Sequence, residues 1–263
     1  MPEGDTVYRA AARLDRALTG HRLTLTDFRV PAFATVDLRE GTVIRTLSRG
    51  KHLLTRVDHE RAWTIHTHLK MEGSWHVYPT GERWRRPDAQ VRLVLGIAGR
   101  TAVGFQLGVV ELVPREQEAG LVAHLGPDLL GPDWDVDRAL ANLRSQPARA
   151  IGEALLDQRN LAGIGNMYMA ELCFTMGVNP ADAVATVDQL PRLVRRGQQM
   201  LQANKERAIQ TTTGDLRPRE RMWVYRRDRS PCRRCGTPIA VAMLGDPGRE
   251  RAAYWCPSCQ PAR

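Results

Sequence analysis

The sequence predicts an α+β protein of more than one domain: an N-terminal β-sandwich with a helix before it, a helical domain, and a zinc-held β-hairpin. Three observations support this fold class. Apolar residues recur with a helical period over residues 5–19, in short strand-like runs between about residues 23 and 113, and with a helical period again beyond residue 134. Two Cys-x2-Cys pairs lie near the C-terminus. A chain of 263 residues is long enough for two modest hydrophobic cores.

The N-terminal helix and the strands after it are marked by residues typical of their ends. Asp5 or Thr6 can cap the helix at its start, and Gly20 can end it. The apolar stripe of this helix consists of Val7, Ala11, Leu14 and Leu18. Glycine and proline separate the later runs, which favours antiparallel strands joined by hairpins. The predicted strands are Thr42–Leu47, Leu53–Val57, Trp63–His68, Trp75–Tyr78, Val91–Leu95 and Val109–Val113.

The second half of the chain is predicted to be helical as far as the cysteine pairs. Residues 125–134 have the composition of a linker, because Gly-Pro-Asp occurs in them twice. Helices are expected at Ala148–Leu161, Asn166–Met176 and Val187–Ile209. The predicted boundaries are 1–124 for the N-terminal domain, 125–135 for the linker, 136–215 for the helical domain and 216–263 for the zinc-finger hairpin.

The charge of the chain favours a polyanionic partner. The formal net charge is +9 and the pI is about 9.9. There is no apolar run of about 18 residues and no charged-then-apolar leader, so we expect a cytoplasmic protein without a membrane partner. Only three of the 38 basic residues are lysines, namely Lys51, Lys70 and Lys205. Each is of interest, because an ammonium can lose its proton near neutral pH whereas a guanidinium cannot.

Four of the five cysteines form a predicted metal site. Cys232 and Cys235 make the first pair, and Cys256 and Cys259 make the second. In a reducing cytoplasm this spacing is typical of one tetrahedral Zn²⁺ with four thiolate ligands, and such a site has no open position for a substrate. We therefore expect a structural zinc. The fifth cysteine, Cys173, is predicted to be a small buried hydrophobic residue.

The N-terminal sequence contains a candidate nucleophile. Removal of Met1 would leave the secondary amine of Pro2 at the end of the chain. At about pH 7.5, roughly a quarter to a third of an α-amino group is neutral, compared with roughly 0.1% of a lysine. The positive end of the following helix favours the neutral amine and attracts phosphate. Glu3 is placed to transfer protons.

Two further turns can present groups to a ligand. Lys51 follows Gly50 at the tip of a predicted hairpin, where a lysine is either solvated or directed toward a cleft. Gly163 and Gly165 allow a tight passage between two helices, and Asn166 can cap the second of them. Free amides at such a helix start are suited to a DNA phosphate.

Two other sets of residues have both a functional and a structural interpretation. His66 and His68 share one face of a strand, so they are either metal ligands or polar strand residues. Trp223 and Tyr225 can stack on bases or pack within the protein.

Taken together and in this order, the motifs resemble the formamidopyrimidine-DNA glycosylase and endonuclease VIII family from residue 2 to residue 260. They are Pro2-Glu3-Gly4, Arg49-Gly50-Lys51, His68-Leu69-Lys70-Met71-Glu72-Gly73, Leu155-Leu156-Asp157-Gln158, Gly163-Ile164-Gly165-Asn166, Cys232-Arg233-Arg234-Cys235 and Cys256-Pro257-Ser258-Cys259. Gly4 and the short segment Thr211–Arg221 are more similar to the endonuclease VIII branch. The resemblance implies a helix-two-turns-helix domain in residues 136–215.

The resemblance implies catalytic roles for four residues. Pro2 would be the Schiff-base nucleophile and Glu3 the proton donor. Lys51 would assist β-elimination. Arg251, five residues before Cys256, would hold a phosphate and assist δ-elimination.

The resemblance also implies DNA contacts. Asn166 and Arg251 would hold phosphates near the lesion. Met71 would fill the space left by a flipped base, and Lys70 before it would contact DNA. His124 would lie at another phosphate contact.

The activity implied is that of a bifunctional DNA glycosylase and abasic-site lyase in base excision repair, with oxidised pyrimidines favoured. The implied partner is damaged DNA, bound by a monomer at the bacterial nucleoid, with no catalytic metal or organic cofactor. Thr6 departs from the family, which usually has a second glutamate at that position. The alternatives are a purine-directed glycosylase for 8-oxoguanine and formamidopyrimidines, a non-catalytic damaged-DNA-binding protein, and an RNA-binding zinc ribbon.

Overall fold

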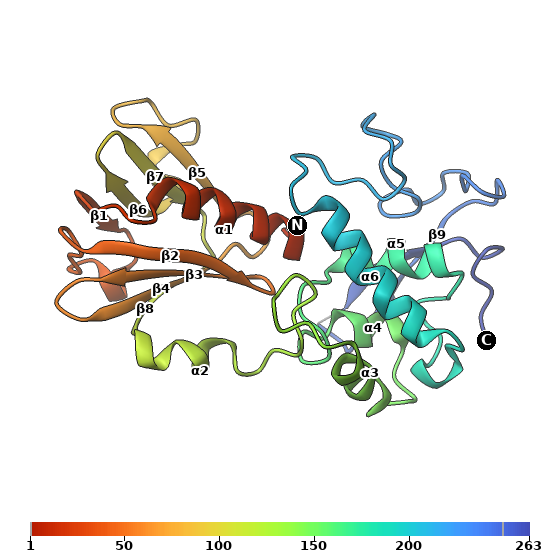
Figure 1. Ribbon diagram of the computed structural model, residues 1–263. Coiled ribbons are helices and arrows are strands. Elements are labelled where there is room, and N and C mark those ends of the chain that lie inside the picture. Colours follow the sequence, from red (N-terminus) through yellow and green to blue (C-terminus); the bar gives the residue numbers. More distant parts are fainter. Residues whose placement is uncertain (1, 249) are drawn as a thin grey trace. The chain divides into compact units, whose positions relative to one another are not determined.

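The computed structural model describes residues 2–248 and 250–263, and the chain divides into two units, Met1–His124 and Leu125–Arg263. Figure 1 shows the helix and the two sheets of the first unit, and the helices and the hairpin of the second. None of the described helices is long and apolar enough to span a membrane.

The first unit begins with helix α1, Gly4–Leu18. All four residues of the predicted apolar stripe are buried, and the Asp15 carboxylate accepts the backbone N–H of Thr46 at 2.8 Å, which ties the helix to a strand. The predicted cap is wrong. Glu3 is the N-cap, and the Asp5 carboxylate instead accepts the N–H of Thr6 at 2.7 Å, inside the first turn.

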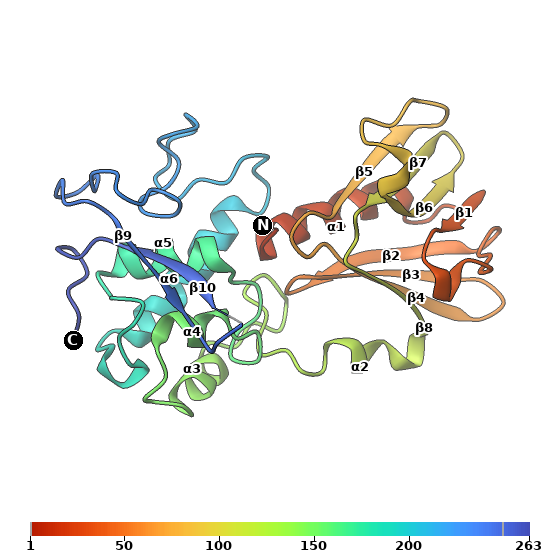
Figure 2. The same ribbon diagram turned by 180° about the vertical axis from the view of Figure 1, so that it is seen from behind.

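Two antiparallel sheets of four strands each follow, in agreement with the predicted antiparallel β-sandwich (Figure 2). One has the order β1-β6-β7-β5, and its strands are Leu25–Phe28, Val91–Ile97, Arg100–Phe105 and Ser74–Pro79. The other has the order β2-β3-β4-β8, and its strands are Thr42–Arg49, His52–Asp58, Ala62–His68 and Val109–Pro114. Buried side chains from α1 and both sheets form one hydrophobic core. Strands β1 and β7 were not predicted. The unit ends with the short helix α2, Glu118–Val122.

The second unit consists of helices and one hairpin. The helices are α3 Val136–Arg144, α4 Ile151–Leu156, α5 Asn166–Met176 and α6 Leu190–Asn204. The hairpin pairs β9, Ala240–Leu244, with β10, Arg251–Trp255. Helix α5 is buried from Asn166 to Phe174 and is central to the unit. Among the described residues there are also four 3-10 turns, at Pro31–Phe33, Asp88–Gln90, Arg115–Gln117 and Val184–Thr186.

Helix α4 is much shorter than the predicted Ala148–Leu161. It ends at Leu156 because the Asp157 carboxylate accepts the backbone N–H of Arg159 at 3.1 Å and thereby favours a turn. Helix α6 also ends earlier than predicted. The side chain of Asn204 donates to the carbonyl of Thr211 and accepts its N–H, each at 2.9 Å.

Candidate functional site

The start of helix α1 holds the candidate nucleophile and two acidic side chains. Pro2 is half-buried and directly precedes Glu3, whose carbonyl accepts the N–H of Val7 at 3.0 Å in the first helical turn. Glu3 and Asp5 are each 1% exposed. The positive end of the helix favours the neutral form of a neighbouring amine. Met1, whose removal would free that amine, lies outside the described residues.

Lys51 lies where the sequence predicts it, at the tip of the β2–β3 hairpin. The turn has two residues, because Arg49 pairs directly with His52. Gly50 has φ +56°, a conformation that glycine adopts without strain at the first position of such a turn. Lys51 is half-buried. Its backbone position is set by this short, well-defined hairpin.

Four histidines gather beside this hairpin. The rings of His52 and His66 stack with centroids 5.0 Å apart, and His52 Nδ1 and His66 Nε2 are hydrogen-bonded at 2.8 Å. His68 and His124 contact the edge of His52, with centroids at 5.0 and 5.6 Å. The other nitrogen of His66, Nδ1, is 2.8 Å from a Glu111 carboxylate oxygen. Both ring nitrogens of His66 are thus engaged, one by His52 Nδ1 and the other by Glu111. In the described residues, the only group whose ligand atoms are close enough for a metal is the set of four cysteines.

The cluster keeps at least two imidazoles neutral near physiological pH. Burial is the main cause that lowers the pKa of His52 to about 3, and the charges of His68, His66, His124 and Lys70 contribute to this shift. Burial lowers the pKa of His68 to about 4, assisted by the charges of Lys70 and Lys51. Both lysine ammonium groups therefore lie close enough to influence His68.

We expect the free energy of unfolding to decrease as the pH falls from about 6.5 toward 4. An imidazole whose pKa is about 6.5 when unfolded but lower when folded takes up its proton only on unfolding, so protonation favours the unfolded chain. Urea unfolding at several pH values measures this slope. The double change His52→Gln/His68→Gln should flatten the slope, and changing the exposed His21 to Gln should not. Equal slopes in all three proteins would contradict the expectation.

The turn after β4 carries Lys70 and Met71. The N–H of Lys70 donates to His68 Nδ1 at 2.8 Å, and Gly73 N–H donates to the Leu69 carbonyl at 2.9 Å. These bonds fix the turn. Met71, at the tip of this turn, is 62% exposed, which is unusual for a large apolar residue. The turn therefore presents Met71 to solvent from a rigid support.

In the second unit, the loop before α5 is held by Gln158. Its side chain donates to the Ile164 carbonyl and accepts the N–H of Gly163, both at 2.9 Å. Gly163 has φ +117°, which disfavours any other residue there. Asn166 does not cap α5 as predicted, because Gly165 is extended and occupies the N-cap.

The side chain of Asn166 instead connects α5 to the hairpin. Its amide N–H donates to the Ala252 carbonyl in β10 at 2.8 Å, next to the exposed Arg251. The Asn166 side-chain oxygen is buried and has no hydrogen-bond partner among the described residues. Asn166 and Arg251 are 85 positions apart in the sequence. The hydrogen bond to Ala252 places the Asn166 side chain beside the backbone of the residue that directly follows Arg251.

The four cysteine sulfurs form a compact cluster, all within 4.8 Å of one another. The distances are 4.0 Å from Cys232 to Cys259, 3.4 Å from Cys235 to Cys256 and 3.5 Å from Cys235 to Cys259. Thiolates about 2.3 Å from a tetrahedral Zn²⁺ would lie about 3.8 Å apart, so the cluster fits one such ion. Cys173 is fully buried in α5, as predicted, and burial raises the pKa of its thiol to about 12.

Comparison with known proteins identifies the family. Residues 1–106 match the formamidopyrimidine-DNA glycosylase N-terminal domain, and residues 125–215 match the formamidopyrimidine-DNA glycosylase H2TH domain. The chain is 55% identical to "Probable endonuclease 8 2" of Streptomyces coelicolor, over 99% of this chain and 94% of that protein. The chain belongs to the formamidopyrimidine-DNA glycosylase and endonuclease VIII family.

Other members of the family are similar over their whole length. "DNA-(apurinic or apyrimidinic site) lyase Nei2" of Mycolicibacterium smegmatis is 48% identical over all of both chains. "Endonuclease 8" of Escherichia coli is 31% identical over 99% of this chain and all of that one. A solved structure of the Lactococcus lactis glycosylase has a TM-score of 0.81 and 20% identity, covering 99% of this chain and 100% of that one, which supports the fold.

Glu171, whose role was not predicted from the sequence, orders the segment after α6. The side chain is fully buried, and it accepts the backbone N–H groups of Trp223, Val224 and Tyr225 at 2.8, 2.8 and 2.7 Å. Burial raises the pKa of Glu171, and these hydrogen bonds oppose that shift. The sequence signal that could have indicated this role is a single acidic residue within the otherwise apolar run Met167–Phe174 of α5.

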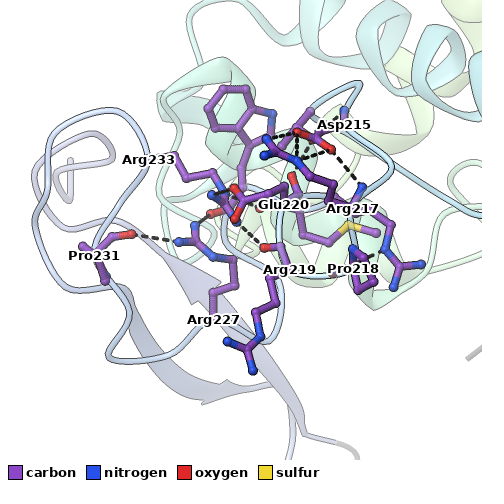
Figure 3. Close-up of polar contacts among 12 residues, drawn as sticks. Asp215, Arg217, Pro218, Arg219, Glu220, Arg227, Pro231 and Arg233 are labelled. Carbon is purple, nitrogen blue, oxygen red and sulfur yellow. Dashed lines mark hydrogen bonds and ion pairs between the residues drawn. The ribbon is translucent and has the colours of Figure 1, made fainter.

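Arginines connect the same segment to the first cysteine knuckle (Figure 3). The guanidinium of Arg233 pairs with Glu220, and its Nε donates to the Met222 carbonyl at 3.0 Å. Arg227 donates to the carbonyl of Pro231 at 2.9 Å. These contacts connect the conformation of residues 219–231 to that of the knuckle that holds Cys232 and Cys235.

Proposed function

We propose that this protein is a bifunctional DNA glycosylase and abasic-site lyase of base excision repair that acts through a Schiff base on Pro2. The observation that carries the proposal is a proline at position 2, next to a buried glutamate and the positive end of α1. Full-length identity of 48% to a protein named as an abasic-site lyase supports it. The bacterial relatives and the net positive charge support action on DNA at the nucleoid.

In the proposed reaction, the target nucleotide first rotates out of the base stack. The Pro2 nitrogen attacks C1′ of the sugar, the glycosidic bond breaks, and Glu3 donates the proton taken up by the leaving group. The C1′–O4′ bond then breaks, O4′ takes up the proton that the Pro2 nitrogen loses, and an open-chain iminium forms. The iminium acidifies the C2′ hydrogen. Loss of that proton, assisted by Lys51, expels the 3′ phosphate, and δ-elimination with Arg251 expels the 5′ phosphate.

We propose that Cys232, Cys235, Cys256 and Cys259 hold one structural Zn²⁺. Four thiolates leave no position for water or substrate, so the ion would stabilise the hairpin, while all reaction steps would use side chains and the Pro2 amine. Because β10 runs directly into Cys256, the ion would also fix the direction of Arg251.

We further propose that Asn166 and Arg251 contact phosphates of damaged DNA, together with Lys70 and His124, and that Met71 enters the space left by the flipped base. The contact between Asn166 and Ala252 supports a shared phosphate site at the start of α5. The exposure of Met71 on a fixed turn supports its role.

DNA affinity is expected to depend strongly on salt. If about five phosphates are neutralised, the log–log slope of the binding constant against salt should be roughly −4 to −5. Changing Asn166 or Arg251 to Ala should weaken binding to all sequences alike, whereas Arg144→Ala on α3 should not. Fluorescence anisotropy at several salt concentrations measures both effects, and an affinity independent of salt would contradict them.

The similarity to endonuclease 8 proteins supports oxidised pyrimidines and hydantoins as preferred lesions. Single-turnover rates on duplexes that each carry one lesion should be higher for these bases than for 8-oxoguanine opposite cytosine. A preference of about tenfold for 8-oxoguanine would favour the purine-directed alternative. Binding without any strand cleavage at an abasic site would favour the non-catalytic alternative.

A further inference from the structure

We propose that a basic hollow in the second unit binds a phosphorylated nucleotide. Its volume is about 580 Å³, within the range of small-molecule sites. It lies between α6, the end of α5, the segment after α6 and the first cysteine knuckle. Neither Asn166 nor Arg251 lines it, so it is separate from the proposed phosphate site at the start of α5. The lining residues that matter here are Arg192, Arg195, Arg196, Arg234, Thr213 and Trp223.

The charge of the hollow is unbalanced. Four arginines line it and no carboxylate does. Arg192, Arg195 and Arg196 have the i, i+3, i+4 spacing that places side chains on one helical face, where like charges repel. Elsewhere in the chain, arginines such as Arg217 pair with a carboxylate. Among the described residues, none of the four arginines of the hollow has an ion-pair partner. A bound polyanion would relieve the repulsion.

The hollow also has a fixed aromatic wall. The Trp223 ring stacks on the buried Phe174, with centroids 5.5 Å apart and an interplanar angle of 26°. The indole N–H of Trp223 donates to the Thr212 carbonyl at 3.2 Å, and its backbone N–H donates to Glu171 at 2.8 Å. The guanidinium of Arg234 lies 4.6 Å from the Phe174 ring centroid. Trp223 is half-buried and lines the hollow, so a fixed apolar surface lies beside guanidinium groups.

This combination selects the ligand class. Guanidinium groups bind phosphate oxygens in pairs, and an indole offers a surface on which a base can stack. Inorganic phosphate would use only the first feature and an apolar ligand only the second. A nucleotide uses both, and it can be a free nucleoside triphosphate or one nucleotide of a single strand. Nucleotide binding in the hollow does not require Schiff-base chemistry at Pro2.

Calorimetric titration of the full-length, zinc-loaded protein tests the site with three probes: dATP, tripolyphosphate and a 5′-phosphorylated single-stranded tetranucleotide. We expect saturable 1:1 binding of at least one nucleotide probe, tighter than that of tripolyphosphate. The tighter of the two nucleotide probes identifies the source of the ligand. Failure of both nucleotide probes to bind, or tripolyphosphate binding as tightly as either, would overturn the proposal.

Variants locate the binding. Arg195→Ala/Arg196→Ala removes two exposed guanidiniums and should weaken nucleotide binding roughly tenfold or more. The matched double change Arg138→Ala/Arg144→Ala, on the exposed face of α3, should leave it unchanged. Trp223→Leu should weaken binding of the nucleotide probes but not of tripolyphosphate. Unfolding temperatures verify that each variant is folded. Equal losses in both arginine pairs would contradict a site in the hollow.

Discussion

Adding one residue before Pro2 is expected to lower strand cleavage at an abasic site by at least several hundredfold while DNA affinity changes little. The extension converts the Pro2 nitrogen into an amide, which cannot form an iminium. The remaining amines are the α-amine of the added residue, which stands one residue farther from Glu3, and lysines, of which roughly 0.1% is neutral near pH 7.5, compared with roughly a quarter of an α-amine. Single-turnover cleavage and anisotropy, measured on the same abasic duplex, separate chemistry from binding.

Two controls accompany this experiment. Pro2→Gly retains an α-amine but makes it primary, so cleavage should fall less than in the extended chain. Lys51→Ala removes an assisting group and should also have the smaller effect. An extended chain that cleaves at the rate of the processed protein would show that Pro2 is not the nucleophile.

The second large effect is expected from Cys256→Ser. Removing one of the four thiolate ligands should release the zinc. The effect on the hairpin should be large, because structural sites of this kind contribute roughly 10–16 kcal/mol of binding free energy that is coupled to folding. The hairpin that carries Arg251 and contacts Asn166 would lose its order, so DNA binding should weaken more than in Arg251→Ala. Metal analysis and anisotropy measure the two effects.

Cys173→Ala is the matched control, because that thiol is buried in α5 and lies outside the cysteine cluster. It should retain one equivalent of zinc per chain. Reduced, active protein without metal, or a Cys256→Ser variant that keeps its zinc, would contradict a four-cysteine structural site.

Much of the fold could be predicted because it is encoded by local pattern. The stripe of α1 is fully buried, and the β2–β3 hairpin turns at Gly50 and Lys51. The elements that were missed depend on less regular signals. Strand β7, Arg100–Phe105, has no apolar–polar alternation, because its last five residues are buried. Helix α4 ends at Leu156 through a side-chain hydrogen bond within a sequence of good helix formers.

The candidate site divides in the same way. Cysteine spacing predicted a cluster that the structure forms, because a metal knuckle is a local motif. The role of Glu171 became visible only with tertiary structure, since its backbone partners lie about fifty residues later. The histidine cluster likewise combines residues from β3, β4 and the end of the first unit. Side chains whose partners are distant in the sequence produce no regular pattern in the sequence, so their roles are difficult to predict from it.

The most direct test of the proposed chemistry is to locate the covalent bond. Borohydride added during turnover on abasic DNA should reduce the iminium and join protein to DNA irreversibly. Peptide mapping of the trapped complex should then find the DNA on an N-terminal peptide that begins at Pro2 and lacks Met1. A covalent adduct on Lys51 or Lys70, or no adduct from protein that cleaves the same DNA, would contradict a Schiff base on Pro2.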